Sequence, residues 1–326
     1  MKKLMAVITA FIMCLILTAC NQTESSSITV YAPDGAPALA LSYAMSSNIE
    51  GVDYKIVGAE VIKTTVTGTD KKADVAILPI NDATKLLGSG EDYKLLGVVT
   101  HGNFYFLSKD NTVITKENAN LLIGKTIGVI QLAKIPGLTL KASLEGLNIP
   151  YKELVGAGEK ASDKANLIAI TPNQIGAQDI DYYMCPSPVA DLKAKALSLN
   201  FVGSLSSIYN ESGFPQAVIV AKNTVITENL QKVKAVISKI KESENYLIEE
   251  NFSSILTTIS SNLEEGLTPS FNQNNLTVES INRSKIKFVS AKEAKVEIQN
   301  FIDKINSISP EVMGNTNDNF YYIGEF

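Results

Sequence analysis

Short apolar runs alternate with amphipathic stretches along most of the chain. Runs rich in β-branched residues predict strands at 28–32, 52–57, 73–78, 95–99, 104–108, 124–130, 180–185 and 214–221. Helical spacing or turn chemistry predicts helices over 36–47, 79–88, 136–147, 163–170 and 186–196. Beyond 221 the pattern predicts helix, interrupted by a loop at 269–277 and followed by an extended segment at 320–323. This alternation predicts an α/β protein with parallel sheets covered by helices on both faces.

Two capping signals divide the C-terminal third of the chain. Thr227 is expected to cap a long helix whose apolar face runs to Leu247. Ser290 and Glu293 form a capping box before a last helix with Ile298, Phe301, Ile302 and Ile305 on one face.

The first twenty residues have the pattern of a bacterial lipoprotein signal peptide. Lys2 and Lys3 precede the uncharged apolar run 4–17, and Leu17-Thr18-Ala19-Cys20 fits a lipobox. An ordinary secretory signal or an uncleaved membrane helix is the alternative, but a run this short barely spans a bilayer. We therefore expect residues 1–19 to be removed and Cys20 to carry the lipid that anchors the chain outside the cytoplasmic membrane.

The composition indicates a globular protein large enough for two lobes. The chain has 326 residues, of which 45% are hydrophobic and 19% are charged. A formal net charge of −5 argues against nucleic acid as a partner.

Cysteine, histidine and arginine are scarce, which limits the available chemistry. Cys14 leaves with the signal and Cys20 is lipidated, so Cys185 has no partner for a disulfide and is expected to be a buried thiol and not a nucleophile. His101 is the single histidine, so a metal site with several histidines is excluded, and a hydrolase triad would have to use His101 itself. Arg283 is the single arginine, which disfavours a strongly anionic ligand because tight two-point binding of a carboxylate or phosphate usually uses arginine.

Five strand-loop segments are distinctive: Val30-Tyr31-Ala32-Pro33-Asp34-Gly35-Ala36-Pro37-Ala38-Leu39-Ala40, 73–81, 93–98, 122–129 and 213–217. Together they resemble the ABC-transporter solute-binding lipoproteins, in particular the group that binds thiamine precursors, nitrate, sulfonate and taurine. Their order and spacing behind a lipobox cover essentially the whole mature chain. This chain departs from the family pattern in two respects: it has no tryptophan, and its only arginine lies late in the sequence, at Arg283.

The resemblance implies the fold of type II periplasmic binding proteins, which is α/β with two lobes of mostly parallel sheet joined by two crossover strands. It places the tether at 20–27, lobe 1 at 28–107 and 215–326, and lobe 2 at 108–214. The crossovers are expected near 104–109 and 214–221, with closure about this hinge on ligand binding.

Candidate ligand contacts lie in loops that follow expected strands, because open α/β sheets bind ligands at the carboxyl ends of their strands. These candidates are Pro33, Asp34, Gly35, Asn81, His101, Asn103, Gln131, Ser187, Tyr209, Phe214 and Gln216. Each has a structural alternative: Asp34 in a plain turn, Asn81 as a helix N-cap, His101 on the surface, or Tyr209 packed between lobes.

The resemblance implies a protein that binds a small molecule and delivers it to an ABC permease without making or breaking bonds. A neutral or weakly charged planar ligand, vitamin-like or pyrimidine-like, is the hypothesis. A monomer without metal or cofactor is expected. The alternatives are a ligand-sensing or surface-interaction lipoprotein and an enzyme on the same fold. The enzyme is disfavoured because His101 is the only histidine available for acid–base catalysis.

Overall fold

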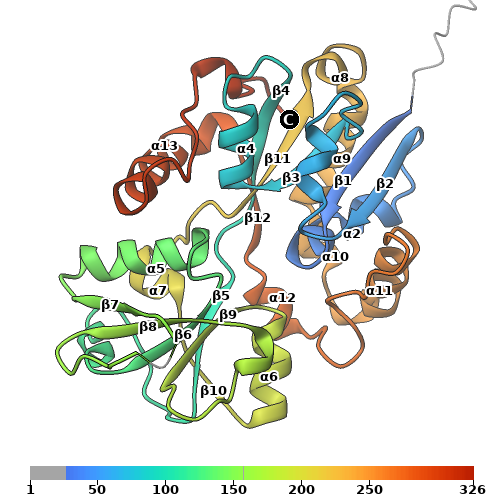
Figure 1. The fold of residues 1–326 in the computed structure, drawn as a ribbon. Helices are drawn as coiled ribbons and strands as arrows, with labels where there is room; N and C mark the ends of the chain where they lie inside the picture. Colours follow the sequence, from blue (N-terminus) through green and yellow to red (C-terminus); the bar gives the residue numbers. More distant parts are fainter. Residues whose placement is uncertain (1–26, 157) are drawn as a thin grey trace, which may run out of the picture.

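The computed structural model describes residues 27–156 and 158–326, and these form two α/β lobes that meet at a narrow waist (Figure 1). The signal peptide at 1–19, the lipidation site Cys20 and the tether up to residue 26 lie outside the described residues. No helix within 27–156 and 158–326 is long and apolar enough to cross a membrane.

Each lobe is built on one six-stranded sheet. The sheet of lobe 1 has the order β12-β4-β11-β3-β1-β2, with β1 Ile28–Pro33, β2 Val52–Val57, β3 Val75–Pro79, β4 Tyr93–Thr100, β11 Ala217–Lys222 and β12 Ile286–Ser290. The sheet of lobe 2 has the order β10-β5-β9-β6-β8-β7, with β5 Phe104–Ser108, β6 Thr126–Ile130, β7 Tyr151–Leu154, β8 Ala165–Ile170, β9 Tyr182–Pro186 and β10 Asn200–Ser204.

Helices cover both faces of each sheet (Figure 1). The α-helices of lobe 1 are α2 Ala36–Ser46, α3 Ile62–Val66, α4 Ile80–Leu87, α8 Asn223–Glu228, α9 Leu230–Lys241, α10 Ser243–Tyr246, α11 Phe252–Ser261 and α13 Ala291–Ile308. Those of lobe 2 are α5 Ile135–Gly146, α6 Val189–Leu197 and α7 Leu205–Tyr209. The remaining helices are α12 Val278–Arg283 and the 3₁₀ turns η1 Ala119–Leu122, η2 Pro172–Gln174, η3 Glu249–Asn251 and η4 Asp318–Phe320.

Strict alternation along the strands separates three hydrophobic cores. In β11, Ile219 faces the core under α2, α9 and α11, whereas Val218 and Val220 face the opposite side. That opposite core continues through the waist into lobe 2, where β6 contributes Ile127 and Val129. A third, smaller core lies on the other face of the lobe 2 sheet. The two lobes therefore share one buried apolar layer at the waist.

The expected α/β two-lobe fold is confirmed, and both sheets are mixed. Strands β1, β2 and β3 pair in parallel, as do β6, β7, β8 and β9. The antiparallel pairs involve β4, β5, β10, β11 and β12. Strand β11 enters lobe 1 from lobe 2, so it runs against the parallel strands beside it.

The chain passes from one sheet to the other between residues 100 and 104, and returns between 209 and 217. The crossing strands themselves each belong to one sheet: Phe104–Ser108 is part of the lobe 2 sheet and Ala217–Lys222 is part of the lobe 1 sheet. The change of sheet therefore precedes the expected lobe boundary at 107 by a few residues.

The C-terminal part adds a further excursion that the sequence pattern did not predict. After α11 in lobe 1, the chain runs to α12, which lies against lobe 2, and then returns as β12 at the edge of the lobe 1 sheet (Figure 1). Residues 286–290 were expected in a helical region, but β4 supplies a hydrogen-bonding edge that only the folded chain presents.

Two further expectations about secondary structure are wrong. The predicted helix at 163–170 is strand β8, because its backbone pairs with β6 on one side and β7 on the other. The predicted long helix from Thr227 is divided into α8, α9 and α10, and the Thr227 hydroxyl donates to the Asn223 carbonyl inside α8 (3.0 Å) instead of capping a helix. The capping box of Ser290 and Glu293 is confirmed.

Candidate functional site

The loop after β1 carries the first group of candidates. The Asp34 backbone N–H donates to the Val57 carbonyl (3.0 Å), and Asp34 Oδ2 accepts from the backbone N–H of Ser270 (2.6 Å). Asp34 Oδ1 is buried and has no hydrogen-bond partner among the described residues. Pro33 is buried, and Gly35 begins α2 with a φ of 99°, where an added Cβ would have open space. Asp34 is therefore not a solvated turn residue; it ties this strand end to the loop before α12.

The first turn of α4 holds Asn81. The residue that caps α4 is Pro79, so Asn81 lies inside the helix and its Nδ2 donates to Asp82 Oδ1 (3.0 Å). Burial raises the pKa of Asp82, while the positive charges of Lys63 and Lys134 lower it. Lys134 comes from the loop before α5 in lobe 2, so the first turn of α4 lies within electrostatic reach of the other lobe. Sequence reasoning missed Asp82 and Lys134, although both follow expected strands in the same loops as Asn81 and Gln131.

Gln131 follows β6 in the opposing lobe. Its φ of 61° turns the chain toward α5, and its carbonyl accepts from the Lys134 N–H (2.9 Å). The residue is exposed, and its side chain makes no hydrogen bond within the described part of the chain. Its amide is thus free to donate to and accept from a molecule between the lobes.

At the waist, Asn103 and Gln216 join the two crossings side chain to side chain. Gln216 Oε1 accepts from the Asn103 backbone N–H and Gln216 Nε2 donates to Asn103 Oδ1, both at 2.9 Å. Asn103 Nδ2 donates to the Ser187 carbonyl (2.8 Å), and the Ser187 N–H donates to the Asn103 carbonyl (3.0 Å). The structure thus brings together three residues chosen independently from the sequence: Asn103, Ser187 and Gln216.

His101 lies beside this group and is 6% exposed, so it is not a surface residue. Its Nε2 is 2.9 Å from the Lys287 carbonyl, and its backbone N–H donates to the Lys285 carbonyl (3.0 Å). Burial lowers the pKa of His101; the hydrogen bond to the Lys287 carbonyl opposes this shift, and the charge of Lys287 adds to it. His101 therefore attaches the first crossing to the segment that leads into β12.

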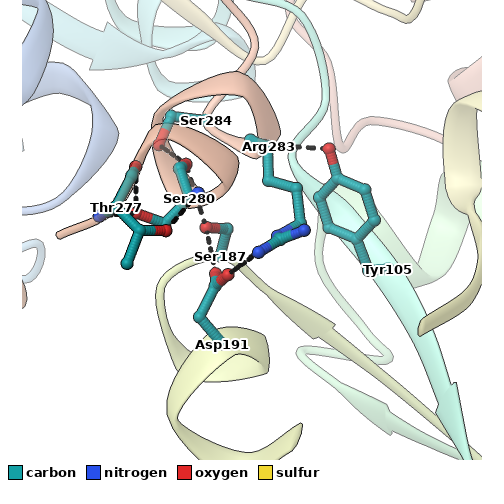
Figure 2. A network of polar contacts seen from close by, with 7 residues as sticks. All are labelled: Tyr105, Ser187, Asp191, Thr277, Ser280, Arg283 and Ser284. Carbon is teal, nitrogen blue, oxygen red and sulfur yellow. Dashed lines mark hydrogen bonds and ion pairs between the residues drawn. The ribbon is translucent and has the colours of Figure 1, made fainter. Parts of the chain in front are cut away.

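Ser187 also belongs to a second network, drawn in Figure 2, that includes the only arginine. Ser187 Oγ donates to Asp191 Oδ2 (2.6 Å), and Asp191 Oδ1 accepts from Arg283 Nε (2.7 Å) and pairs with Nη2 (2.5 Å). The Arg283 guanidinium lies 4.2 Å from the centre of the Phe201 ring, and its backbone carbonyl accepts from the Tyr105 hydroxyl (3.0 Å). The single arginine is thus already paired, a role that the sequence pattern could not show.

Tyr209 and Phe214 lie in an aromatic cluster between the lobes. The Phe214 ring is stacked on Phe301 of α13 at 5.6 Å, and Tyr209 meets both rings edge to face at 5.9 and 6.0 Å. Phe214 is fully buried. Burial raises the pKa of Tyr209, and the charge of Glu297 adds to this shift. Both rings therefore pack the waist in this structure, and their contact with a ligand stays a prediction.

Two cavities are found among the described residues. One of about 660 Å³ lies at the outer edge of β2, between Lys55, Thr64, Lys72 and Glu264. The other, of about 330 Å³, lies behind the waist and has His101, Gly213 and Lys287 among its walls. Cys185 is fully buried, and burial raises the pKa of its thiol to about 12. No group of three or more histidine, cysteine, aspartate or glutamate side chains within 27–156 and 158–326 is placed to hold a metal ion.

Solved structures match the chain over most of its length. An ABC transporter protein from Parabacteroides distasonis superimposes with a TM-score of 0.68 at 18% identity, covering 92% of this chain and 100% of that one. The chain has the fold of ABC-transporter substrate-binding proteins. The periplasmic aliphatic sulphonate binding protein SsuA from Escherichia coli gives a TM-score of 0.60 at 12% identity, covering 91% of this chain and 92% of its own.

A third structure is the zinc-bound ligand-binding component of an ABC-type import system from Staphylococcus aureus. It superimposes with a TM-score of 0.57 at 11% identity, covering 91% of this chain and 96% of that one. No protein-family model and no curated protein sequence matches the chain. At these identities the matches establish the two-lobe fold that the sequence resemblance implied.

Proposed function

We propose that this chain is the extracytoplasmic solute-binding lipoprotein of an ABC importer. In this proposal Cys20 carries the lipid anchor, and the two lobes capture a small molecule and present it to a membrane permease. The observation that carries the proposal is the fold: two lobes, each built on one sheet, in which the first turn of α4 at Asn81 and the loop after β6 at Gln131 come from opposite lobes. The solved structures that share this fold include a ligand-binding component of an ABC-type import system and a periplasmic sulphonate-binding protein.

The ligand in this proposal is neutral or weakly charged and planar, as a vitamin-like or pyrimidine-like compound is. Two features support it. Arg283, the only fork-shaped cation, is already occupied by Asp191 and Phe201. The first turn of α4 and the loop after β6 offer the amides of Asn81 and Gln131, which can both donate to and accept from the edge of a heterocycle.

The first experiment is native mass spectrometry of residues 27–326, which contain every described helix and strand. Protein purified gently from its expression host is then denatured to release any bound compound. A stoichiometric small molecule supports the proposal and gives the ligand mass. Expression in a second host tests whether an empty protein only reflects the absence of the ligand from the first host.

Thermal unfolding of stripped protein tests the ligand class. Uracil and cytosine represent neutral planar compounds, and ethanesulfonate and nitrate represent anions. A ligand at 100 times its Kd should stabilise the fold by about 2.7 kcal/mol, equivalent to a rise in Tm of about 5 °C. A rise with the anions alone would contradict the neutral ligand and leave the solute-binding role intact.

Site variants connect the binding to the strand-end loops. Asn81→Leu and Gln131→Ala should each weaken binding by about tenfold, which corresponds to one lost hydrogen bond of about 1.4 kcal/mol. Thr257→Ala, on the exposed side of α11, is the matched control and should leave binding unchanged. Conversion of the bound compound to a product would favour an enzyme. Solute capture would be refuted if no compound co-purified and if none of the tested compounds changed the separation of the lobes.

A further inference from the structure

The segment before β12 is attached to lobe 1 at the end of β1. The Ser270 backbone N–H donates to Asp34 Oδ2 (2.6 Å), and Phe271 is 2% exposed within the core of lobe 1. Asn275 closes the turn: its Nδ2 donates to the Ser270 carbonyl and its Oδ1 accepts from the Asn272 N–H, both at 2.7 Å. This end of the segment is therefore ordered and bound to lobe 1.

The other end of the same segment is attached to lobe 2 at the end of β9. Helix α12 begins with the Thr277 and Ser280 capping box and ends at Arg283, whose guanidinium is paired with Asp191 (Figure 2). The Asp191 side chain is 8% exposed and also accepts from Ser187. A charge pair at this depth is costly to break, because the partner left behind is a buried charge without compensation.

The two attachments share one structural position in their lobes. Asp34 directly follows the parallel strand β1. Ser187, whose hydroxyl donates to the Ser280 carbonyl of α12 (3.5 Å), directly follows β9, and Asp191 lies in the first turn of the next helix, α6. Residues 270–283 therefore run from a strand-end loop of one lobe to a strand-end loop of the other. The lobes cannot separate on this side unless one attachment breaks or the short connection between them lengthens.

We propose that residues 270–283 form a strap that ties the two lobes together and sets their separation before any ligand binds. The hinge crossings then permit movement, and the strap limits it. In this arrangement Asp191 and Arg283 are positioning residues that act on lobe geometry. The proposal goes beyond solute binding and holds whatever the ligand is.

Distance measurement between the lobes tests the strap. Spin labels are placed through Thr224→Cys on α8 and Ala196→Cys on α6, both at exposed positions, in residues 27–326. Cys185 stays unlabelled because its free thiol is buried. The ligand-free distance distribution is then recorded by pulsed electron paramagnetic resonance for each strap variant.

Asp191→Asn and Arg283→Met should each shift the distribution to longer and broader distances. The matched control is Lys222→Met, which removes a partly buried pair with Asp74 (3.0 Å) that lies entirely within lobe 1; the exposure of Lys222 matches that of Arg283. The control should reduce stability without moving the distribution. If α12 served only to stabilise lobe 2, the strap variants would behave like the control.

An unchanged distribution in folded strap variants overturns the proposal. Where Asp191→Asn does not fold, Arg283→Lys decides by the same readout, because it keeps the charge but loses the two-point contact and the stacking on Phe201. A shift of intermediate size supports the strap and no shift refutes it. No ligand enters the measurement, so its outcome is independent of whether the solute-binding proposal succeeds.

Discussion

Gly213 offers the sharpest test of how the two crossings are packed. Its φ is 89°, and a Cβ added there would lie 2.2 Å from the backbone oxygen of His101. That oxygen belongs to the other crossing and cannot rotate away as a side chain would. Gly213→Ala therefore forces the two crossings apart, in addition to placing alanine in a left-handed conformation.

The expected loss of stability combines three terms. The left-handed conformation costs alanine about 1 to 2 kcal/mol, and the reduced entropy of the unfolded chain returns about 0.4 to 1 kcal/mol. The contact with the His101 oxygen adds about 1 to 3 kcal/mol, as overpacking does in other cores. Gly213→Ala should lower the free energy of unfolding by about 1 to 5 kcal/mol, of which the contact with the His101 oxygen contributes about 1 to 3 kcal/mol.

Gly266→Ala is the matched control because its φ is 82° and an added Cβ would meet nothing within 4 Å. It should cost about 1 kcal/mol or less, since only the conformational terms remain. Urea unfolding followed by far-UV circular dichroism and tyrosine fluorescence measures both variants, because the chain has 12 tyrosines and no tryptophan. Equal losses for the two glycines would refute the proposed contact between the crossings.

Three further predictions concern the waist and lobe 2. Gln216→Leu leaves the Asn103 N–H and Oδ1 buried without partners, so urea unfolding should show a loss of about 2 to 4 kcal/mol in the free energy of unfolding. The control Gln299→Leu removes an exposed hydrogen bond to Asp303 and should cost much less. Similar losses for the two variants would contradict the network. Because burial lowers the pKa of His101, the unfolded chain binds a proton at His101 at a higher pH than the folded chain does; the contribution of neutral His101 to stability is therefore full above pH 6.5 and is lost as the pH falls through the folded pKa. The difference in unfolding free energy between wild type and His101→Asn should shrink from pH 7.5 to 5.5. A difference that does not change with pH would contradict this prediction. The Cys185 thiol, with a pKa raised to about 12, should not react with Ellman's reagent at pH 8 until urea unfolds the protein, whereas rapid reaction of the native protein would show that the site opens.

Much of the local structure follows from the sequence pattern. The run Ile28 to Ala32 is strand β1, and the capping box at Ser290 starts α13 with Phe301 and Ile305 buried as the spacing predicts. These features depend on neighbours within a few residues, such as alternation of apolar side chains or a hydroxyl that caps its own helix. The fold class could be predicted because such local signals recur in a regular order.

The exceptions share a cause. Residues 165–170 form a strand because β6 and β7 supply hydrogen bonds on both edges, although the local pattern was compatible with a helix. Strand β12 forms because β4 has a free edge beside it. Backbone pairing of this kind is decided by partners that lie far away in the chain.

The candidate site shows the same division. Sequence reasoning selected Asn103, Ser187 and Gln216 separately from strand ends and crossings, and only the folded chain joins them by hydrogen bonds. Arg283 was noted for being the only arginine, but its pairing with Asp191 depends on an excursion of the chain that no local signal marks. Local propensities are set within a turn or two of chain, whereas a buried charge needs a partner that tertiary structure alone can bring. The sequence by itself thus determined most of the elements and the loops that end them, because those signals are local. The tertiary structure decided the strands that need distant partners, β8 and β12, and which loops meet.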